Sequence, residues 1–442
     1  MKRVKRLLAG IVSLLLAVTI IGNENLIVTH AATLPTSNVF ISGSTDKGYN
    51  AKVTYDLKVS QASKMVLTCM SYGDVSMSYY SADLSEWYDT VYAYTDSAAS
   101  PVTKVITAYV SPGTYKVVID NERSAASRYQ IKASISSLGT NDIEPNDFDH
   151  AMTLNKGATI TGALTTQDKE DWYKITTTSK FVRLSISAYE DMDINVYNQD
   201  LSETLDYDYL YGKPASPDQQ ILEFCGSNVY YVKVSSGSWD DGGKYKLSWT
   251  AGTVPTVKNV KLQKLSSTEI KVTWDQNNAF DYYQVYRATS EKGKYSLLGV
   301  YNKYYDTKYS TGLKTGTKYY YKVRGYRVIN KRRVMGAFSP VVSATPSLKA
   351  PKNLTVSQSV RKALSITWNY DGEASYYQLY RASSLNGKYA LLGTYDKYTT
   401  YKRSTSLTSG RRYYYKVRSY KWVSGKRVFS PFSDIRSGVA NK

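Results

Sequence analysis

The stretch Tyr282–Ala288, YYQVYRA, returns 94 residues later as Tyr376–Ala382, YYQLYRA. The same offset relates two YYYKVR segments, which begin at Tyr319 and Tyr413. A repeat of this length is a whole β-sandwich, because the units of solenoid proteins span only about 20–50 residues. The chain therefore contains one β-sandwich domain in two copies.

Near the end of the repeat the offset changes. Ser339-Pro340 of the first copy matches Ser430-Pro431 of the second, which lowers the offset to 91. Losses of residues between related domains concentrate in loops. The pattern therefore predicts that the second copy has lost three residues, 94 − 91, in a loop.

Each copy also has a starting proline, one tryptophan on an early strand and a Leu-x-x-Gly-x-x-Tyr segment: Pro255, Trp274 and Leu313–Tyr319, then Pro351, Trp368 and Leu407–Tyr413. A tryptophan in that place can fill the core between two sheets, and the segment matches the tyrosine-corner turn. With these features, residues 255–346 and 350–440 resemble fibronectin type III domains. Both lack cysteine, which excludes the disulfide-pinned immunoglobulin variant.

Short strands are also predicted in the first half of the chain. Lys52–Val59 and Tyr129–Ile135 alternate between apolar and polar residues with period two, as half-buried strands do. Trp172–Thr176 continues the strand pattern after a linker near residue 139. We therefore expect β-sandwiches at residues 32–138 and 139–252, and an all-β fold of four sandwiches in tandem.

The second predicted sandwich contains two spaced motifs. Glu144–Asp147, EPND, opens it, and Asp168–Tyr173, DKEDWY, follows Gly162–Leu164. With these motifs, residues 139–252 resemble the bacterial pre-peptidase C-terminal domain and the related collagen-binding domain of clostridial collagenases, which implies a jelly-roll-like sandwich. Residues 32–138 resemble a divergent relative that lacks the opening motif.

Oxygen-bearing side chains gather in the same motifs. Calcium takes six to eight oxygen ligands, commonly carboxylates and amide carbonyls. In the collagen-binding relatives a linker acidic pair, an Asn-Asp and two loop aspartates bind calcium, and the resemblance places these roles on six residues: Asp142, Glu144, Asn146, Asp147, Asp168 and Asp171. The last two are expected in a hairpin. The alternative is a solvated acidic linker without an ion.

The N-terminus has the pattern of a secretory signal. Lys2–Arg6 is basic, Leu7–Ile21 is apolar, and cleavage is expected after Ala31. We therefore expect a secreted protein, extracellular or associated with the cell wall, without a transmembrane segment. Cys69 and Cys225 fall in different predicted sandwiches, so we expect two small buried apolar residues rather than a disulfide.

Charge divides the chain into two halves. Residues 255–442 contain 35 Lys and Arg against 9 Asp and Glu, a net +26, whereas residues 32–254 contain 18 against 27, a net −9. A strongly basic surface attracts polyanions through steering and counterion release. The candidate polyanion-binding residues are Lys331, Arg332, Arg333, Lys426, Arg427, Arg411 and Arg412. A generally soluble basic surface, or one that docks on the acidic half, is the alternative.

Residues suited to catalysis are scarce. Beyond the predicted signal the sequence has one histidine, His150, which every Ser-His-Asp or Cys-His arrangement would have to use. Zinc sites of clustered His and Cys are excluded by count, and no Gly-rich phosphate loop occurs. A carboxylate pair for glycoside hydrolysis needs no sequence signature and stays open. We expect a protein that is not an enzyme.

Together these features predict a secreted binding protein. Its expected partners are anionic cell-wall or extracellular polysaccharide, another glycan or a matrix protein, and no motif indicates specific nucleic-acid binding. Outward-facing tyrosines, from a total of 44, can stack on sugars or peptides, although they also stabilise exposed strands by cross-strand pairing. The alternatives are a structural spacer, an accessory subunit of a secreted hydrolase, or a wall hydrolase with an unrecognised carboxylate pair.

Overall fold

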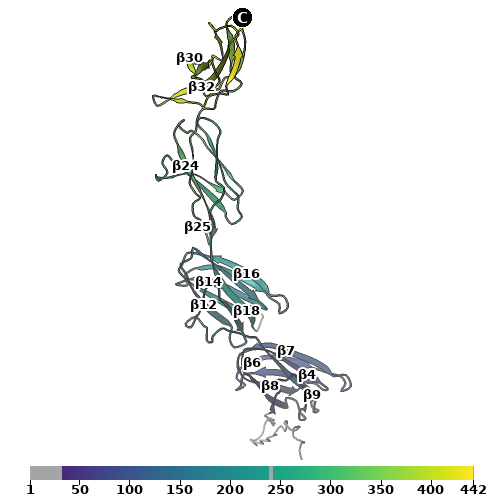
Figure 1. Cartoon of the computed structure of the whole chain (residues 1–442). Coiled ribbons are helices and arrows are strands. Elements are labelled where there is room, and N and C mark those ends of the chain that lie inside the picture. The colour runs from purple at the N-terminus through teal and green to yellow at the C-terminus, as the bar shows by residue number, and fades with distance from the viewer. Residues whose placement is uncertain (1–31, 238–241, 442) are drawn as a thin grey trace, which may run out of the picture. The chain divides into compact units, whose positions relative to one another are not determined.

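The computed structural model describes residues 32–237 and 242–441, so the predicted signal of residues 1–31 lies outside the described residues. The described chain consists of β-strands, β1 to β34, which confirms the all-β fold class (Figure 1). Within these ranges we find no helix of the length and apolarity that a membrane span requires. The chain divides into two compact units, residues 1–252 and 253–442, and each is described by itself.

The first sandwich combines a five-stranded sheet, in the order β1-β3-β8-β5-β6, with a four-stranded sheet, β2-β9-β4-β7. Along β3 every second side chain is buried, as the period-two pattern predicts, and side chains of both sheets share one apolar core. The strands are β1 Ala32–Thr33, β2 Ile41–Ser44, β3 Lys52–Val59, β4 Ser63–Ser71, β5 Val75–Tyr80, β6 Trp87–Ala93, β7 Val102–Val110, β8 Gly113–Asn121 and β9 Arg128–Ser137.

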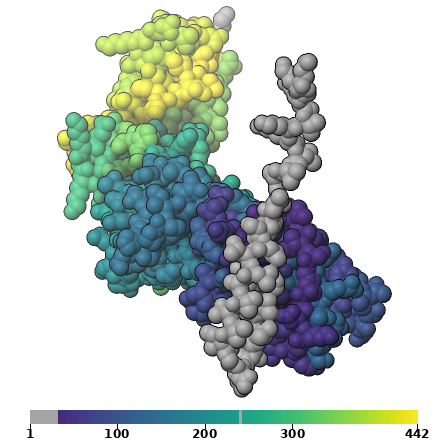
Figure 2. Space-filling model, turned by 90° about the horizontal axis from the view of Figure 1, so that it is seen from below, coloured from purple at the N-terminus to yellow at the C-terminus, as the bar shows by residue number. Residues whose placement is uncertain are grey.

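The second sandwich repeats this topology strand for strand. Its sheets have the orders β10-β12-β17-β14-β15 and β11-β18-β13-β16, and β10 pairs in parallel with β12 as β1 does with β3. Figure 2 shows the first and second sandwiches, which together form the first compact unit, in purple to teal. The strands are β10 Met152–Thr153, β11 Thr159–Leu164, β12 Glu170–Thr176, β13 Phe181–Ala188, β14 Asp191–Asn198, β15 Thr204–Tyr211, β16 Asp218–Phe224, β17 Val229–Ser236 and β18 Gly243–Gly252.

The second unit contains two further sandwiches of one topology. The first has the sheets β19-β20-β23 and β22-β21-β24-β25, with β26 also paired to β24. Its strands are β19 Lys261–Lys264, β20 Ile270–Thr273, β21 Tyr282–Ala288, β22 Ser296–Asn302, β23 Thr307–Ser310, β24 Tyr319–Ile329, β25 Arg332–Met335 and β26 Val342–Ala344.

The last sandwich has the equivalent sheets β27-β28-β31 and β30-β29-β32-β33, with β34 also paired to β32. Its strands are β27 Thr355–Gln358, β28 Leu364–Thr367, β29 Tyr376–Ala382, β30 Ala390–Asp396, β31 Tyr401–Ser404, β32 Arg412–Val423, β33 Lys426–Phe429 and β34 Arg436–Val439.

The tryptophan and the tyrosine that match between the two copies have the predicted roles in each copy. Trp274 and Trp368 are 4% and 3% exposed and belong to the two apolar cores. Tyr319 accepts a hydrogen bond from the backbone N–H of Lys314 at 2.9 Å, and Tyr413 accepts the equivalent bond at 3.0 Å. This bond to a backbone group a few residues upstream is the tyrosine corner, which the Leu-x-x-Gly-x-x-Tyr segment predicts.

The predicted loss of three residues from the second copy is wrong. Ser339 bonds through its backbone N–H and its hydroxyl to Val323, and Ser433 makes the same two bonds to Val417, at an offset of 94. The final strands keep that offset, since Val342 pairs with Tyr321 as Arg436 pairs with Tyr415. The Ser-Pro sequence at 430 is a separate turn, which the sequence comparison mistook for the equivalent of Ser339.

The two cysteines are buried in separate sandwiches, and no disulfide joins them. Cys69 is 1% exposed and belongs to the core of the first sandwich, and Cys225 is 3% exposed. Burial raises the pKa of the Cys69 thiol to about 12. Both residues therefore have the predicted role of small apolar side chains rather than that of reactive thiols.

Candidate metal centre

The linker that opens the second sandwich is hydrogen-bonded to it at two points. The backbone N–H of Asn141 donates to the carbonyl of Thr161 on β11 at 2.9 Å, and Thr161 donates back to the Asn141 side chain at 2.6 Å. Further along, the N–H of Trp172 on β12 donates to the carbonyl of Asn146 at 2.6 Å. The linker therefore lies across β11 and β12 with its acidic residues between the two anchors.

Three carboxylates converge where the linker meets β12. Asp142, Glu144 and Asp171 each offer an oxygen, and these oxygens lie within 4.8 Å of one another. Asp171 is fully buried, Asp142 half-buried and Glu144 exposed. Three carboxylates this close repel one another when they are ionised. The site is therefore suited to a positive ion, or to shared protons in its place.

Asp168 extends the group from the turn between β11 and β12. Its backbone N–H donates to the Thr165 hydroxyl at 3.1 Å, and its carbonyl accepts from the Thr165 N–H at 2.8 Å. These two bonds close the turn. Its side chain shares a hydrogen bond with Glu144. Because two carboxylates can share such a bond only when one of them carries a proton, the pair favours holding a proton when no cation is near.

The pKa values of the group are all raised. Burial is the main cause at each residue, and neighbouring carboxylates add to it at Glu144, Asp168 and Asp171. The pKa of Asp168 rises to about 6, that of Glu144 to about 7 and that of Asp171 to about 9, while Asp142 shifts in the same direction. A carboxyl in a desolvated site beside like charges favours its neutral form.

Several buried polar atoms of this group have no partner among the described residues. Asn146 is 1% exposed, yet neither its amide oxygen nor its amide nitrogen has a hydrogen-bond partner among the described residues. The Oδ2 atom of Asp142 and the Oδ1 atom of Asp171 are likewise buried without a partner. Buried polar groups are almost always paired in folded proteins. Carboxylate and amide oxygens are what calcium prefers, so these residues fit that ion.

The first sandwich provides an internal comparison. In each sandwich two buried tyrosines share a hydrogen bond, Tyr55 with Tyr129 at 2.7 Å and Tyr173 with Tyr245 at 2.5 Å. Two residues before the first tyrosine of each pair, β3 has Val53 and β12 has Asp171, which accepts a further bond from Tyr245. The tyrosine pair thus belongs to the shared fold, and the buried carboxylate is the addition of the second sandwich.

Gly162 makes room for this arrangement. A Cβ atom at that position would lie 2.3 Å from the ring of Tyr245 and 2.9 Å from Asp142 Oδ2. No side chain fits there without displacing a member of the site. The roles of Gly162 and Tyr245 were missed in the sequence. The alternation of Asp171, Tyr173 and Ile175 along one strand face could have placed Asp171 in the interior rather than in the expected hairpin.

Asp147 does not join the group of oxygens. It is exposed, and its Oδ1 accepts from the His150 backbone at 3.0 Å and pairs with His150 Nδ1 at 2.7 Å. This pairing lowers the pKa of Asp147. Five of the six predicted residues thus lie along the anchored linker, its turn and β12, whereas Asp147 turns toward the one histidine of the described chain.

The basic residues of the tail divide between two places. Lys331–Arg333 and Lys426-Arg427 occupy the hairpins β24–β25 and β32–β33, where all five side chains are exposed. Arg427 lies over the rings of Tyr420 and Trp422 at 5.8 and 5.5 Å. Arg411 and Arg412 lie at the start of β32, at the opposite end of a strand that spans about 35 Å. The structure therefore does not bring them to the hairpin.

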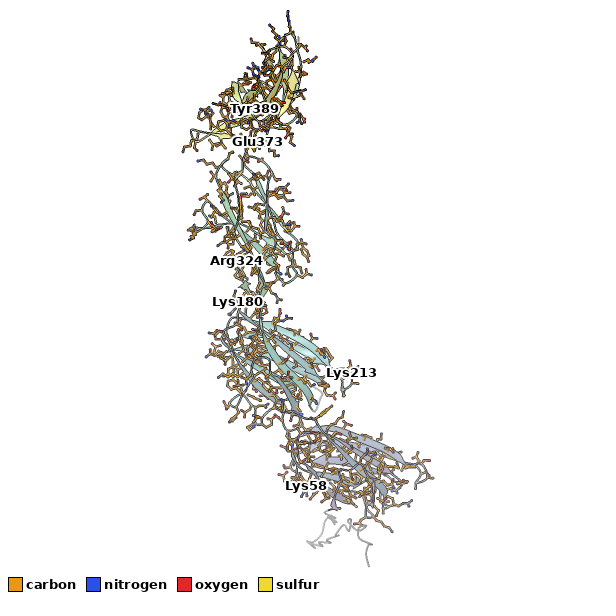
Figure 3. All side chains as sticks on the ribbon, in the orientation of Figure 1. Lys58, Lys180, Lys213, Arg324, Glu373 and Tyr389 are labelled. Carbon is orange, nitrogen blue, oxygen red and sulfur yellow. The ribbon has the colours of Figure 1, made fainter. Side chains whose placement is uncertain are left out.

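Other cations of the tail are engaged between aromatic rings. Lys322 lies 4.2 Å from the ring centre of Tyr295 and 4.0 Å from that of Phe338, and Arg324 lies 4.7 Å from that of Phe338. The second copy repeats the stack with Tyr389 and Phe432 around Lys416 and with Arg418, and Figure 3 labels Arg324 and Tyr389. Such stacking stabilises the sheet face. The hairpin residues are the more exposed cations.

Comparison with known proteins finds similarity among solved structures alone. No protein-family model matches the chain, and no curated protein matches it. Among solved structures, a segment of two fibronectin type III domains from chicken tenascin is 18% identical, covers 42% of this chain and 99% of its own, with a TM-score of 0.29. The fibronectin domains FN1–FN3 of chicken CNTN1 are 14% identical, covering 59% of this chain and 98% of their own, with a TM-score of 0.22. The structural neighbours are thus tandem fibronectin type III domains, and nothing matched supports the pre-peptidase resemblance.

Proposed function

We propose that this chain is a secreted, non-catalytic binding protein that attaches to extracellular polymer, either a cell-wall polysaccharide or other glycan, or a matrix protein. The observation that supports this proposal most directly is an aromatic surface on the second sandwich. It lies on the outward side of the sheet formed by β12, β17, β14 and β15. We call it the aromatic face, and its exposed or half-buried members, packed around the buried Trp172, are Phe148, Tyr197, Tyr207, Tyr209, Tyr211 and Tyr231.

The aromatic face follows from the alternation of its strands. Tyr173 on β12 and Val196 on β14 point into the core, so their neighbours Trp172 and Tyr197 point outward and stack at 5.7 Å. On the edge strand β15, Tyr207 and Tyr211 are 74% and 70% exposed. Tyrosine and tryptophan supply large, stiff contact areas at binding surfaces. The face is therefore suited to an extended partner.

Calcium would couple the metal centre to this face. Asp142, Glu144, Asn146, Asp168 and Asp171 would hold the ion, which neutralises the carboxylates and fixes the linker on β12. Phe148 follows the linker directly, and its ring packs at 5.2 Å against both Trp172 and Tyr231. An anchored linker therefore holds Phe148 in place on the aromatic face. In the basic unit, the exposed hairpins Lys331–Arg333 and Lys426-Arg427 would retain anionic polysaccharide.

A co-sedimentation assay tests the proposal. The mature chain is incubated with insoluble collagen or with cell-wall polysaccharide, in calcium or in EGTA. We expect binding to one of these polymers, with a loss of about tenfold in Tyr207→Ala/Tyr211→Ala. Tyr49→Ala is the control, because Tyr49 is 68% exposed on the first sandwich. An equal effect of both variants, or no binding to either polymer, would leave a structural spacer as the better description.

A further inference from the structure

Two exposed tyrosine rings lie together at one end of the last sandwich. Tyr370 follows β28 and Tyr398 precedes β31. Because these strands are antiparallel neighbours, the two loops lie at the same end of their sheet. The rings are nearly parallel, at 16°, with centres 6.3 Å apart. They are 50% and 75% exposed, so their outer surfaces face solvent. The two rings form a small aromatic platform.

Both rings are attached to well-anchored backbone. On one side, Asn369 and Asp371 donate their N–H groups to the Lys352 carbonyl at 3.0 Å and to the Tyr377 hydroxyl at 2.6 Å. On the other side, Asp396 Oδ1 accepts from the N–H groups of Tyr398 and Thr399, at 3.0 and 2.9 Å. A surface that is already ordered loses less entropy when a ligand binds.

A cation lies at the edge of the platform. Lys397 Nζ lies 4.9 Å from the ring centre of Tyr398. A hydrogen bond with Tyr398, together with the nearness of Tyr370, raises the pKa of Lys397. The carboxylates of the two loops accept hydrogen bonds within those loops: Asp396 from Thr399, and Asp371 from the Glu373 N–H at 3.1 Å. The ammonium group is therefore the charge that the platform presents to a ligand.

The first copy of the domain lacks half of this platform. Lys303 and Tyr304 correspond to Lys397 and Tyr398, with the ammonium 5.4 Å from the ring centre. Gln276 stands at the position of Tyr370, and its amide donates to the Tyr304 carbonyl at 2.6 Å. The paired rings are thus a specific feature of the second copy rather than a consequence of the shared fold.

We propose that Tyr370, Tyr398 and Lys397 form a binding site for a uronic-acid residue of an acidic polysaccharide. The C–H face of a pyranose ring stacks on tyrosine, as apolar surface does on any aromatic ring. Its carboxylate, attached to the same ring, reaches the ammonium beside the platform through a charge-assisted hydrogen bond. A phosphate or sulfate chain without a sugar ring satisfies the lysine but not the tyrosines. This site rests on the proposed function, attachment to anionic polysaccharide, and it specifies uronic acid as the sugar that the protein recognises.

Titration calorimetry of the mature chain tests this site. The probe is a hyaluronan decasaccharide, which alternates glucuronate with a neutral sugar, and the comparison ligands are a neutral chitin oligosaccharide and inorganic polyphosphate. We expect Tyr398→Ala and Tyr370→Gln, which copies the first domain, each to weaken hyaluronan binding about tenfold. The matched control is Tyr304→Ala, an exposed tyrosine beside a lysine without the second ring, which should change binding less than about twofold.

The remaining outcomes distinguish this site from the proposed function. Lys426→Ala/Arg427→Ala on the hairpin tests general polyanion retention in the same assay. If that variant loses hyaluronan while Tyr370→Gln and Tyr398→Ala do not, the platform is overturned and the proposed retention stands. Polyphosphate binding that falls equally in the tyrosine variants also overturns the platform, because a phosphate chain has no ring to stack. If the wild-type chain does not bind hyaluronan, the platform is overturned as a uronic-acid site, whereas the proposed attachment is decided by the co-sedimentation assay.

Discussion

The metal centre has two states available to it: ionised carboxylates that bind a cation, or carboxyls that hold protons in its place. Replacing Asp171 with asparagine distinguishes these two states. The side chain is fully buried, one oxygen accepts a bond from Tyr245, and the other has no partner within the described chain. Asparagine has the same shape and can still accept from the tyrosine, but it is always neutral. We therefore expect Asp171→Asn to stabilise the calcium-free protein at neutral to alkaline pH and to abolish its stabilisation by calcium.

The sign of the pH effect follows from the raised pKa. An acid whose pKa is about 9 when folded and near 3.8 when unfolded contributes stability below pH 3.8, and that contribution is lost as pH rises toward 9. At about pH 8 the calcium-free wild type is thus destabilised by up to about 6 kcal/mol relative to a neutral side chain, at about 1.4 kcal/mol per pKa unit. Detachment of the linker would admit water and limit this cost. We expect a measured gain of about 2 kcal/mol in the variant.

Calcium should make the wild type, rather than Asp171→Asn, the more stable protein at alkaline pH. The ion binds ionised carboxylates, so its effect grows from about pH 5 to about pH 8 as Asp168 and Glu144 ionise. At a calcium concentration of about 100 times Kd, binding adds about 2.7 kcal/mol, or about 5–10 °C in Tm for a unit of this size. Asp171→Asn should lose this increment.

The assay is thermal unfolding of the mature chain by circular dichroism, in EGTA or in calcium, at about pH 5 and at about pH 8. Asp147→Asn is the matched control, because Asp147 is exposed and paired with His150, and it should keep the wild-type calcium response. The reasoning is refuted if Asp171→Asn keeps the full calcium shift at alkaline pH. It is also refuted if the calcium-free wild type is equally stable at the two pH values.

Three further predictions concern other parts of the chain. Gly162→Ala places a Cβ against Tyr245 and should destabilise the second sandwich by about 2 kcal/mol or more, measured by urea unfolding with Gly113→Ala as the control. Tyr413→Phe removes the tyrosine-corner bond and should cost about 1 kcal/mol in the same assay, without change in the calcium response. Lys426→Ala/Arg427→Ala should elute from a heparin column at lower salt than wild type, and equal elution would argue against polyanion retention by this hairpin.

Much of the fold was predictable because local pattern and global structure agree. The offset of 94 residues, the two core tryptophans and the tyrosine corners depend on contacts that each copy makes within itself. Period-two alternation located strands such as Lys52–Val59 to the residue. The one error in the repeat, at Ser430, arose because two Ser-Pro turns resemble each other in sequence, and only hydrogen-bond partners distinguish the equivalent of Ser339.

The candidate metal centre was predictable only in part. Residue chemistry nominated six oxygen donors, but the spacing along a linker says nothing about which way each side chain turns. Asp147 turns to His150, three residues away, whereas Asp171 is directed inward by the alternation of β12. The support from Tyr245 comes from 74 residues along the chain, and sequence proximity cannot reveal it. Arg411 and Arg412 share the charge of the hairpin cations, but the length of β32 separates them from the hairpin, and composition does not reveal that distance.

The all-β class, the duplication of the last domain and the opposite net charges of the two halves can be read from the amino-acid sequence, because these properties depend on local periodicity, repetition and composition. Which of those charged and aromatic residues meet depends on the folded chain. Burial of Asp171 beside Asp142 and Glu144, and the stacking of Tyr370 on Tyr398, depend on long-range strand pairing, which sets distances that no spacing along the chain encodes.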